Sequence, residues 1–396
     1  MASRLRWLVL SVFVLSTALN YLDRLLLAAL APTLKSEFHL TNTQYGGVIS
    51  VFSIVYALTA PVAGWFIDRV GLNAGITVSM AVWSLAGMAT GWTRSFGGLL
   101  ASRTVLGIGE AAGIPCAGKA NGVYLQPREL AFGTALNQVG ITIGSIAAPL
   151  MVAVMAPVYG WRSVFVVCGA LGFVWIPGWW ATTTKFPAKA EEKAAARGGV
   201  ANILGDRRIW GLAAANALVM TLYTLWTNWT TLYFVEQYHL TEIQANERFV
   251  WIPTVFATLG GFAGGWMAFR TIKSGRHGSD VLRARLRICW QAAGLLLLTA
   301  TVPLMPTPGL AAALISFSFF WCLAISTNLY AMPIDFFGAG HAAFGVSILT
   351  ASYGLMQTVL SPVIGSMVDH FGFPMVCVSL SVMPLAGIGI LRASTR

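Results

Sequence analysis

The chain has 396 residues, of which 57% are hydrophobic and 10% are charged, and its formal net charge is +11. Soluble globular proteins carry roughly 25% charged residues, so the composition excludes an ordinary soluble domain. Apolar runs of about 20 residues, long enough to cross a hydrocarbon core, recur along the whole chain. We expect twelve such runs, centred near residues 18, 56, 84, 110, 142, 172, 220, 258, 294, 318, 353 and 383.

The positive charges are unevenly distributed. They gather before the first run, between the sixth and seventh runs, around the segment between the eighth and ninth, and at the C-terminus, whereas "VPLMPTPG" has none. With twelve crossings these basic segments all fall on one side, and Lys and Arg mark the cytoplasmic side. We therefore expect a multi-pass protein of the inner (cytoplasmic) membrane with both termini in the cytoplasm. The charge then meets lipid headgroups and does not indicate a nucleic-acid partner.

The first apolar run contains "NYLDR", which brings the acid Asp23 and the base Arg24 into the membrane. A charge at the bilayer centre costs about 2.5–3.5 kcal/mol, so both side chains must face the interior of a helix bundle. At 3.6 residues per turn, Asn20, Asp23 and Arg24 fall within an arc of about 100°. We predict that Asp23 and Arg24 share one interior face, where a protonatable Asp23 competes with an anionic substrate for Arg24.

The second run has Tyr56 near its middle and is followed by "GWFIDRVG". Glycine allows close helix packing, which we expect of Gly64, and Asp68 can cap or pair with a neighbouring helix end. Arg69 is expected to stay at the lipid interface. The segment resembles the signature of the major facilitator superfamily, which implies a conformational gate formed by these residues and Gly71; the alternative is an ordinary charged turn.

The fourth run carries Arg103 and Glu110, which are seven residues apart and share a face of a helix that begins near Phe96. In a continuous helix Asn121 extends that face and Lys119 points the opposite way. At 1.5 Å per residue, Arg103 lies at the depth of Arg24, and Glu110 lies about 10 Å further in. We predict that Arg103 adds positive charge to the same cavity as Arg24 and that Glu110 is a second proton carrier.

The polar segment 185–206, "KFPAKAEEKAAARGGVANILGD", divides the chain into 1–184 and 207–396. It predicts a cytoplasmic linker between two six-helix bundles, and hence an all-α integral membrane protein with twelve transmembrane helices. A six-plus-six arrangement is typical of a duplicated transporter whose binding site lies near the bilayer midplane. We find no nucleophile–base pair, metal-ligand spacing or phosphate loop, and therefore expect a transporter and not an enzyme.

Polar side chains also recur at helical spacing in later runs. Gln138 lies on such a stripe in the fifth run, Tyr223 in the seventh and Asn328 in the tenth. Taken singly, each is more often a helix–helix hydrogen bond than a substrate contact. Together with Tyr56 they favour a polar central cavity.

Six segments of the chain resemble one family. They are "NYLDR", "GWFIDRVG", "RTVLGIGEA", "PREL", "GWRSVFVVCGALGFVW" and "SPVIGSMVDHFG". Together they resemble the anion:cation symporter family of the major facilitator superfamily, which includes bacterial hexuronate, galactonate and glucarate transporters and animal sialin. The resemblance covers nearly the whole chain and is strongest in the N-terminal half.

The resemblance implies roles for single residues. Arg24 corresponds to the arginine that contacts the substrate carboxylate, and Asp23 and Glu110 to acids implicated in proton coupling. The family's helix 4 arginine, helix 2 tyrosine and helix 5 amide correspond to Arg103, Tyr56 and Gln138. An asparagine often seen in helix 11 corresponds to Ser352.

We therefore expect proton-coupled symport of a small organic anion, such as a sugar acid, by alternating access. The expected partners are this anion, protons and membrane lipids, and we expect no cofactor. We expect a proton gradient, in preference to a sodium gradient, to drive transport, and we expect a monomeric protein. The alternative is a lipid or drug exporter of the same superfamily, similar to the spinster transporters. The direction of transport and sensitivity to sugar acids distinguish the two.

Overall fold

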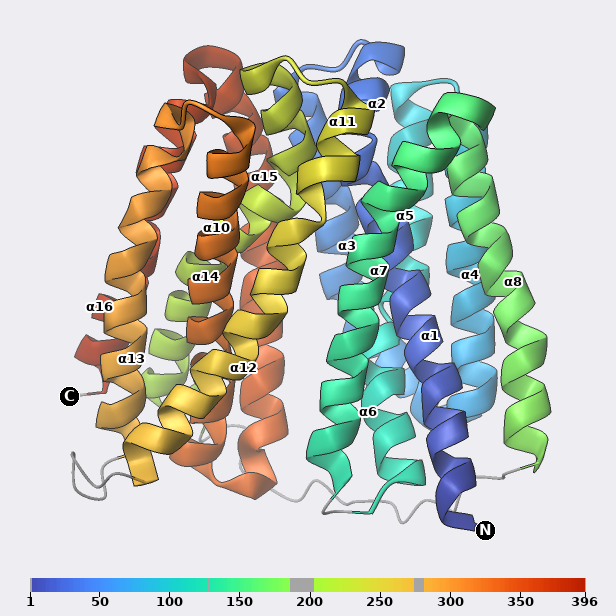
Figure 1. Cartoon of the computed structure of the whole chain (residues 1–396). Helices are drawn as coiled ribbons and strands as arrows, with labels where there is room; N and C mark the ends of the chain where they lie inside the picture. Colours follow the sequence, from blue (N-terminus) through green and yellow to red (C-terminus); the bar gives the residue numbers. More distant parts are fainter. Residues whose placement is uncertain (1, 127–128, 186–202, 274–280, 396) are drawn as a thin grey trace. The chain divides into compact units, whose positions relative to one another are not determined.

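The structure is a computed structural model that describes residues 2–126, 129–185, 203–273 and 281–395 (Figure 1). Most of the predicted linker, residues 186–202, lies outside the described residues, as do Pro127 and Arg128 of "PREL". Internal contacts divide the chain into two compact units, which we describe separately. In the described ranges every regular element is a helix.

The first unit comprises Met1–Leu40, Gly47–Lys193 and Leu240–Trp251. Its elements are α1 (Ala2–Ala29), α2 (Ala31–Phe38), α3 (Asn42–Val70) beyond its first residues, α4 (Leu72–Trp92), α5 (Phe96–Glu110), α6 (Gly113–Tyr124), α7 (Leu130–Tyr159), α8 (Trp161–Lys185), α11 (Glu242–Ala245) and the π-helical turn η2 (Asn246–Val250).

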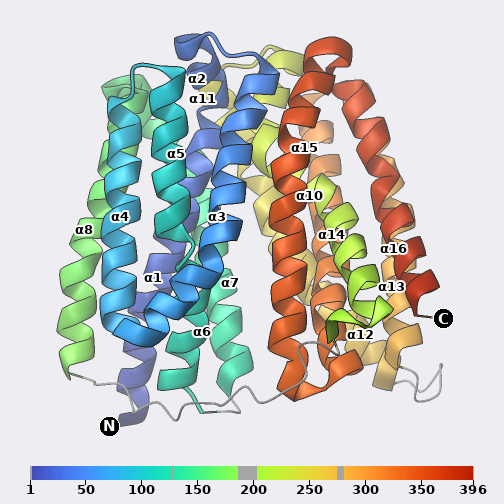
Figure 2. The same cartoon turned by 180° about the vertical axis from the view of Figure 1, so that it is seen from behind.

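The second unit comprises Thr41–Gly46, Ala194–His239 and Ile252–Arg396. Its elements are the first turn of α3, α10 (Arg207–Tyr238), α12 (Ile252–Lys273), α13 (Val281–Leu296), the 3₁₀ segment η3 (Leu297–Leu304), α14 (Pro308–Phe337), α15 (Ala339–Ser381) and α16 (Met383–Ser394). Figure 2 shows these helices from behind.

Ten helical stretches of the described residues are long and apolar enough to cross a membrane. Two features account for the difference from the twelve predicted runs. The fourth run is split into α5 and α6, and the last two runs fall within one stretch, Phe344–Ser394, that bends at Gly372. Gly372 has a φ of 71°, a conformation that glycine adopts without steric cost. The prediction of an all-helical, multi-pass membrane protein is confirmed.

The break between α5 and α6 corrects the prediction of one continuous fourth helix. Pro115 lies in the first turn of α6 and has no backbone N–H to donate to the carbonyl of Ala111, four residues earlier. The chain turns at Ala111 and Ala112, both buried. The helical phase of Glu110 therefore does not extend to Asn121 and Lys119.

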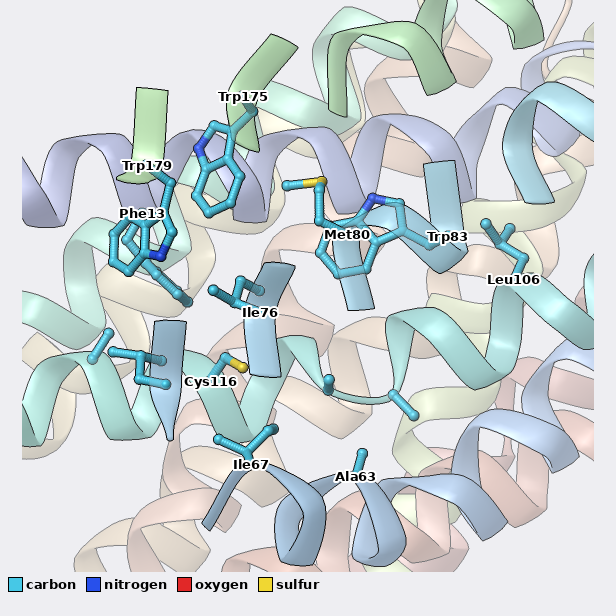
Figure 3. Close-up of a cluster of buried hydrophobic side chains, with 14 of the residues drawn as sticks. Phe13, Ala63, Ile67, Ile76, Met80, Trp83, Leu106, Cys116, Trp175 and Trp179 are labelled. Atoms are coloured by element: carbon cyan, nitrogen blue, oxygen red, sulfur yellow. The ribbon is translucent and has the colours of Figure 1, made fainter. Parts of the chain in front are cut away.

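In the first unit, α1 packs along α7 and α4 packs along α8. Gly140 on α7 allows the close approach to α1, because a Cβ there would lie 2.8 Å from the carbonyl oxygen of Val14. Buried aromatic side chains join α8 to α1 and α4 (Figure 3). Trp175 and Trp179 stack with ring centroids 5.3 Å apart, and Trp175 Nε1 donates to the Val12 carbonyl at 2.7 Å. This core fixes the helices that carry the charged residues.

In the second unit, α12 packs along α14, and α10 packs along α15 and α16. Gly264 brings α12 against α14, because a Cβ there would lie 2.5 Å from the carbonyl oxygen of Ala324. Asp206 caps α10 by accepting a hydrogen bond from the backbone N–H of Arg208 at 2.8 Å. The Arg208 side chain also bonds this carboxylate and holds the pKa of Asp206 below its usual value.

Candidate functional site

The centre of the first unit is an ion pair between Arg24 on α1 and Glu110 at the end of α5. Arg24 Nε and Nη2 donate to the same oxygen, Oε2 of Glu110, at 3.0 and 2.9 Å. The Glu110 side chain is fully buried, whereas that of Arg24 is 23% exposed. Hydrogen bonds between ionised partners are roughly twice as strong as those between neutral groups. The sequence predicted Asp23 as the partner of Arg24; in the structure that partner is Glu110.

Three aromatic rings surround the Arg24 guanidinium, and we call them the aromatic cage. The Arg24 Cζ atom lies 5.0 Å from the ring centroid of Tyr21, 4.9 Å from that of Phe52 and 4.8 Å from that of Tyr56. A guanidinium within about 6 Å of an aromatic face is stabilised by the negative potential of that face. The cage therefore stabilises the cation through its aromatic faces, in addition to the hydrogen bonds with Glu110.

Sequence reasoning identified Tyr56 but missed Tyr21 and Phe52. The signal was present in the spacing. Tyr21 precedes Arg24 by three residues, and Phe52 precedes Tyr56 by four, so each pair lies on one helix face. That the two faces meet depends on how α1 packs near α3, which spacing within one helix does not reveal.

Two glycines place Glu110 beside Arg24. A Cβ on Gly107 would lie 3.0 Å from the Phe52 carbonyl oxygen on α3. A Cβ on Gly109 would lie 2.7 Å from the backbone nitrogen of Trp83 on α4. Larger residues would separate α5 from both helices. The "GIGEA" segment therefore acts as a packing motif, which the sequence reasoning did not identify.

Asp23 points away from the ion pair, although it is the neighbour of Arg24 in the chain. It is 2% exposed and faces α4 and α8. Its Oδ1 lies 2.8 Å from the position that a Cβ on Gly87 would take, and the Cys168 thiol lies beside the carboxyl group. Successive side chains of a helix diverge by about 100°. The predicted direct competition of Asp23 for Arg24 is therefore wrong for this structure.

Arg103 is buried on α5, with 2% of its surface exposed. Its guanidinium carbon lies 5.4 Å from the ring centroid of Phe165 on α8. Arg103 is also close enough to Asp23 and Glu110 for its charge to act on both carboxyl groups. The interior of the first unit thus gathers two acids and two arginines, as the sequence predicted, but in a different pairing.

Gln138 does not join this group by any contact that the structure describes. Its side chain is exposed on α7, and its backbone carbonyl accepts a hydrogen bond from the Thr142 hydroxyl at 2.9 Å. The neighbouring amide, Asn137, instead faces α1, where its Oδ1 accepts from the Thr17 hydroxyl at 3.4 Å. A substrate contact at Gln138 stays a prediction.

The remaining predicted binding residues lie in the second unit. Tyr223 packs edge-on against Phe319 and Tyr353, and the Ser352 hydroxyl donates to the Leu349 carbonyl at 2.7 Å. Asn328 is fully buried; its Nδ2 donates to the carbonyls of Ala324 and Gly264, and its Oδ1 accepts from Arg285. These protein partners satisfy the Asn328 amide and favour a structural role for it.

The predicted gate residues form a small cluster at the end of α3. Lys119 of α6 donates to Asp68 Oδ1 at 3.1 Å and to the Ile67 carbonyl at 3.2 Å, so it ties the two helix ends together. Arg69 lies over the Trp65 ring, and Gly71 has a φ of 87°. Gly64 has open space around its Cβ position, so the expected close packing at that residue is absent from the described structure.

Comparisons with known proteins agree with this architecture. The chain is 28% identical to the hexuronate transporter of Escherichia coli K12, over 97% of this chain and 92% of that protein. It is 30% identical to the galacturonate transporter of Dickeya chrysanthemi over 66% and 81%, and 25% identical to a D-galactonate transporter of Escherichia coli O6:H1 over 97% and 94%.

Among solved structures, a bacterial homologue of the human lysosomal transporter Spinster superposes with a TM-score of 0.83 at 18% identity, covering 98% of this chain and 96% of that one. Residues 13–348 match the model of the Major Facilitator Superfamily. The expectation of a transporter and not an enzyme is confirmed by these relationships. The chain belongs to the Major Facilitator Superfamily.

Proposed function

We propose that this protein is a secondary transporter that carries a sugar acid, or a related small carboxylate, together with protons. The observation that supports the proposal most directly is the Arg24–Glu110 pair inside the aromatic cage. The similarity to hexuronate, galacturonate and galactonate transporters points to the same substrate class.

The pairing links substrate binding to protonation. A substrate carboxylate can make the two-bond contact with the Arg24 guanidinium only when Glu110 releases it. Protonation of Glu110 removes the competing negative charge, and ionisation of Glu110 after substrate release restores the pair. Asp23, buried separately, provides a second carboxyl group that can carry a proton.

The wider proposal follows the sequence expectations. Transport follows alternating access, as in other transporters built from repeats, and Tyr223 and Ser352 of the C-terminal half 207–396 are further substrate contacts. Gly64, Asp68, Arg69 and Gly71 serve as the cytoplasmic gate, and Lys119, which donates to Asp68, is an addition to that expectation. The protein acts as a monomer in the inner membrane with both termini in the cytoplasm.

The test is uptake of labelled D-glucuronate and D-galacturonate by proteoliposomes. An acidic exterior should drive accumulation above the external concentration, and collapsing the pH gradient with a protonophore should abolish it. Replacing sodium with potassium should have no effect. Accumulation that persists without a pH gradient would overturn the proton coupling.

The alternative is lipid or drug export, for which the shared fold with the Spinster homologue leaves room. At 18% identity that likeness concerns the fold and does not select a substrate. A thermal-shift screen separates the two: sugar acids should raise the unfolding temperature, and lysophospholipids or amphipathic cations should not. Stabilisation by the amphiphiles alone would favour the exporter.

A further inference from the structure

Asp23 occupies a site of its own in the seam between α1, α4 and α8. The residue is 2% exposed, and its Oδ1 accepts no hydrogen bond from any described residue. From the position of a Cβ on Gly87, Oδ1 would be 2.8 Å away and Oδ2 3.2 Å away. Any side chain at residue 87 would therefore occupy the space that the carboxyl now fills.

The seam is narrow because α8 approaches α4 through glycines. A Cβ on Gly169 would lie 2.5 Å from the Ser84 carbonyl oxygen and 2.6 Å from Met88 Cγ. Cys168, the preceding residue, is 2% exposed and presents its thiol to Asp23. Phe165, one turn earlier on α8, lies under Arg103. One face of α8 thus contacts both Asp23, through Cys168, and Arg103, through Phe165.

The charged and titratable groups that act on Asp23 are Cys168 from α8 and Glu110 and Arg103 from α5, and Gly87 of α4 lies against its carboxyl. The Arg24 guanidinium is directed instead to Glu110 and the aromatic cage. Asp23 and Arg24, which are adjacent in the "NYLDR" segment, therefore belong to different sites.

We propose that Gly87 and Cys168 are positioning residues that hold the Asp23 carboxyl in this seam, apart from Arg24, so that Asp23 exchanges protons without entering the substrate-binding pair. The inference rests on the proposed proton coupling. Gly87 leaves the space for the carboxyl, and the Cys168 S–H is placed to donate to the carboxylate form. Asp23 and Glu110 are then two proton sites of different construction, one beside a thiol and one beside a guanidinium.

The contact can be tested without transport. In the infrared spectrum of the purified protein, the S–H stretching band of Cys168 is identified as the band that Cys168→Ser removes. We expect Asp23→Asn to shift this band and Glu129→Gln, a remote carboxylate paired with Arg6, to leave it in place. An unshifted band in Asp23→Asn would overturn the role of Cys168, whatever the substrate proves to be.

The functional part is tested by the pH profile of sugar-acid uptake. Cys168→Ala removes the S–H donor and makes the ionised Asp23 less favourable, so the midpoint of the pH profile should move to higher pH by about half a unit or more. Cys168→Ser keeps a donor and should restore the midpoint. Gly87→Ala should move the midpoint in the same direction. The KM at the acidic plateau should change less than about threefold, because Arg24 keeps its partners.

Two controls separate these effects from general damage. Gly178→Ala makes the same change in α8 at a position with open space, and Cys377→Ala removes a buried thiol of the second unit; both should keep the wild-type midpoint. Unchanged midpoints in Gly87→Ala and Cys168→Ala, or a change in KM alone, would overturn the proposal. If the wild-type protein shows no proton-driven uptake, the proposed function fails, and the infrared result still decides the contact.

Discussion

Arg24 and Glu110 meet through a single carboxylate oxygen. Glu110 Oε2 accepts from both Nε and Nη2 of Arg24, at 3.0 and 2.9 Å, while Oε1 is buried and accepts no hydrogen bond from any described residue. A proton can therefore add to Oε1 without first displacing the guanidinium. Once the carboxyl is neutral, its attraction for Arg24 falls and a substrate carboxylate can take its place.

Glu110→Gln should uncouple binding from protonation. The neutral amide no longer competes as an anion, so sugar-acid binding at neutral pH should strengthen roughly 10- to 150-fold, since a hydrogen bond to a charged group is worth about 1.5–3 kcal/mol. Accumulation driven by a pH gradient should be lost. Titration calorimetry measures the first effect and proteoliposome uptake the second. Glu129→Gln, a carboxylate paired with Arg6 at 2.7 Å, is the matched control, and accumulation by Glu110→Gln would contradict the prediction.

Arg24→Lys should weaken sugar-acid binding while keeping the positive charge. Lysine offers a compact point charge and loses the planar, two-bond contact with a carboxylate. We expect an affinity loss of roughly 10- to 100-fold, which corresponds to about 1.4–2.8 kcal/mol. Arg162→Lys changes an arginine that pairs with the half-exposed Glu37 and should bind the ligand normally. Equal affinities of Arg24→Lys and the wild type would show that charge alone suffices.

Phe52→Leu should lower the apparent affinity by removing one ring of the aromatic cage. A cation–π contact contributes about 0.5–2 kcal/mol depending on its desolvation, which predicts an increase in KM of roughly 2- to 30-fold. Tyr56→Phe keeps its ring under the guanidinium and should have the smaller effect. The reverse order in uptake kinetics would indicate that the Tyr56 hydroxyl contacts the substrate directly.

Gly109→Ala should lower both stability and transport, because the added methyl group would lie 2.7 Å from the backbone nitrogen of Trp83 and 2.9 Å from the Cβ of Trp83. Overpacking of this kind costs about 1–3 kcal/mol, and it moves Glu110 relative to Arg24. The unfolding temperature and Vmax should both fall. Gly97→Ala places its methyl group in open space on the same helix and serves as the control. An unchanged unfolding temperature in Gly109→Ala would show that α5 and α4 adjust freely.

The sequence predicted the parts of the fold that depend on local hydrophobicity. The sequence shows directly the long apolar runs, the polar segment after residue 184 and the charges within apolar runs at residues 23, 24, 103 and 110. Prediction failed where the chain breaks its own periodicity. The prediction counted one continuous helix from Arg103 through Asn121. In the structure α5 ends at Glu110 and a new helix, α6, carries Pro115 in its first turn.

By itself, then, the sequence determined a membrane-spanning helical protein with two acids and two arginines buried in its first half, because the cost of placing charge in lipid leaves few alternatives. Only the tertiary structure decided which acid meets which base. Asp23 and Arg24 are adjacent in the chain but diverge by about 100° around α1, so their partners come from different neighbouring helices. The glycines at 107 and 109 bring Glu110 to Arg24, and Gly87 admits Asp23 to the seam beside Cys168. Such pairings arise from packing between helices, which no pattern within one helix encodes.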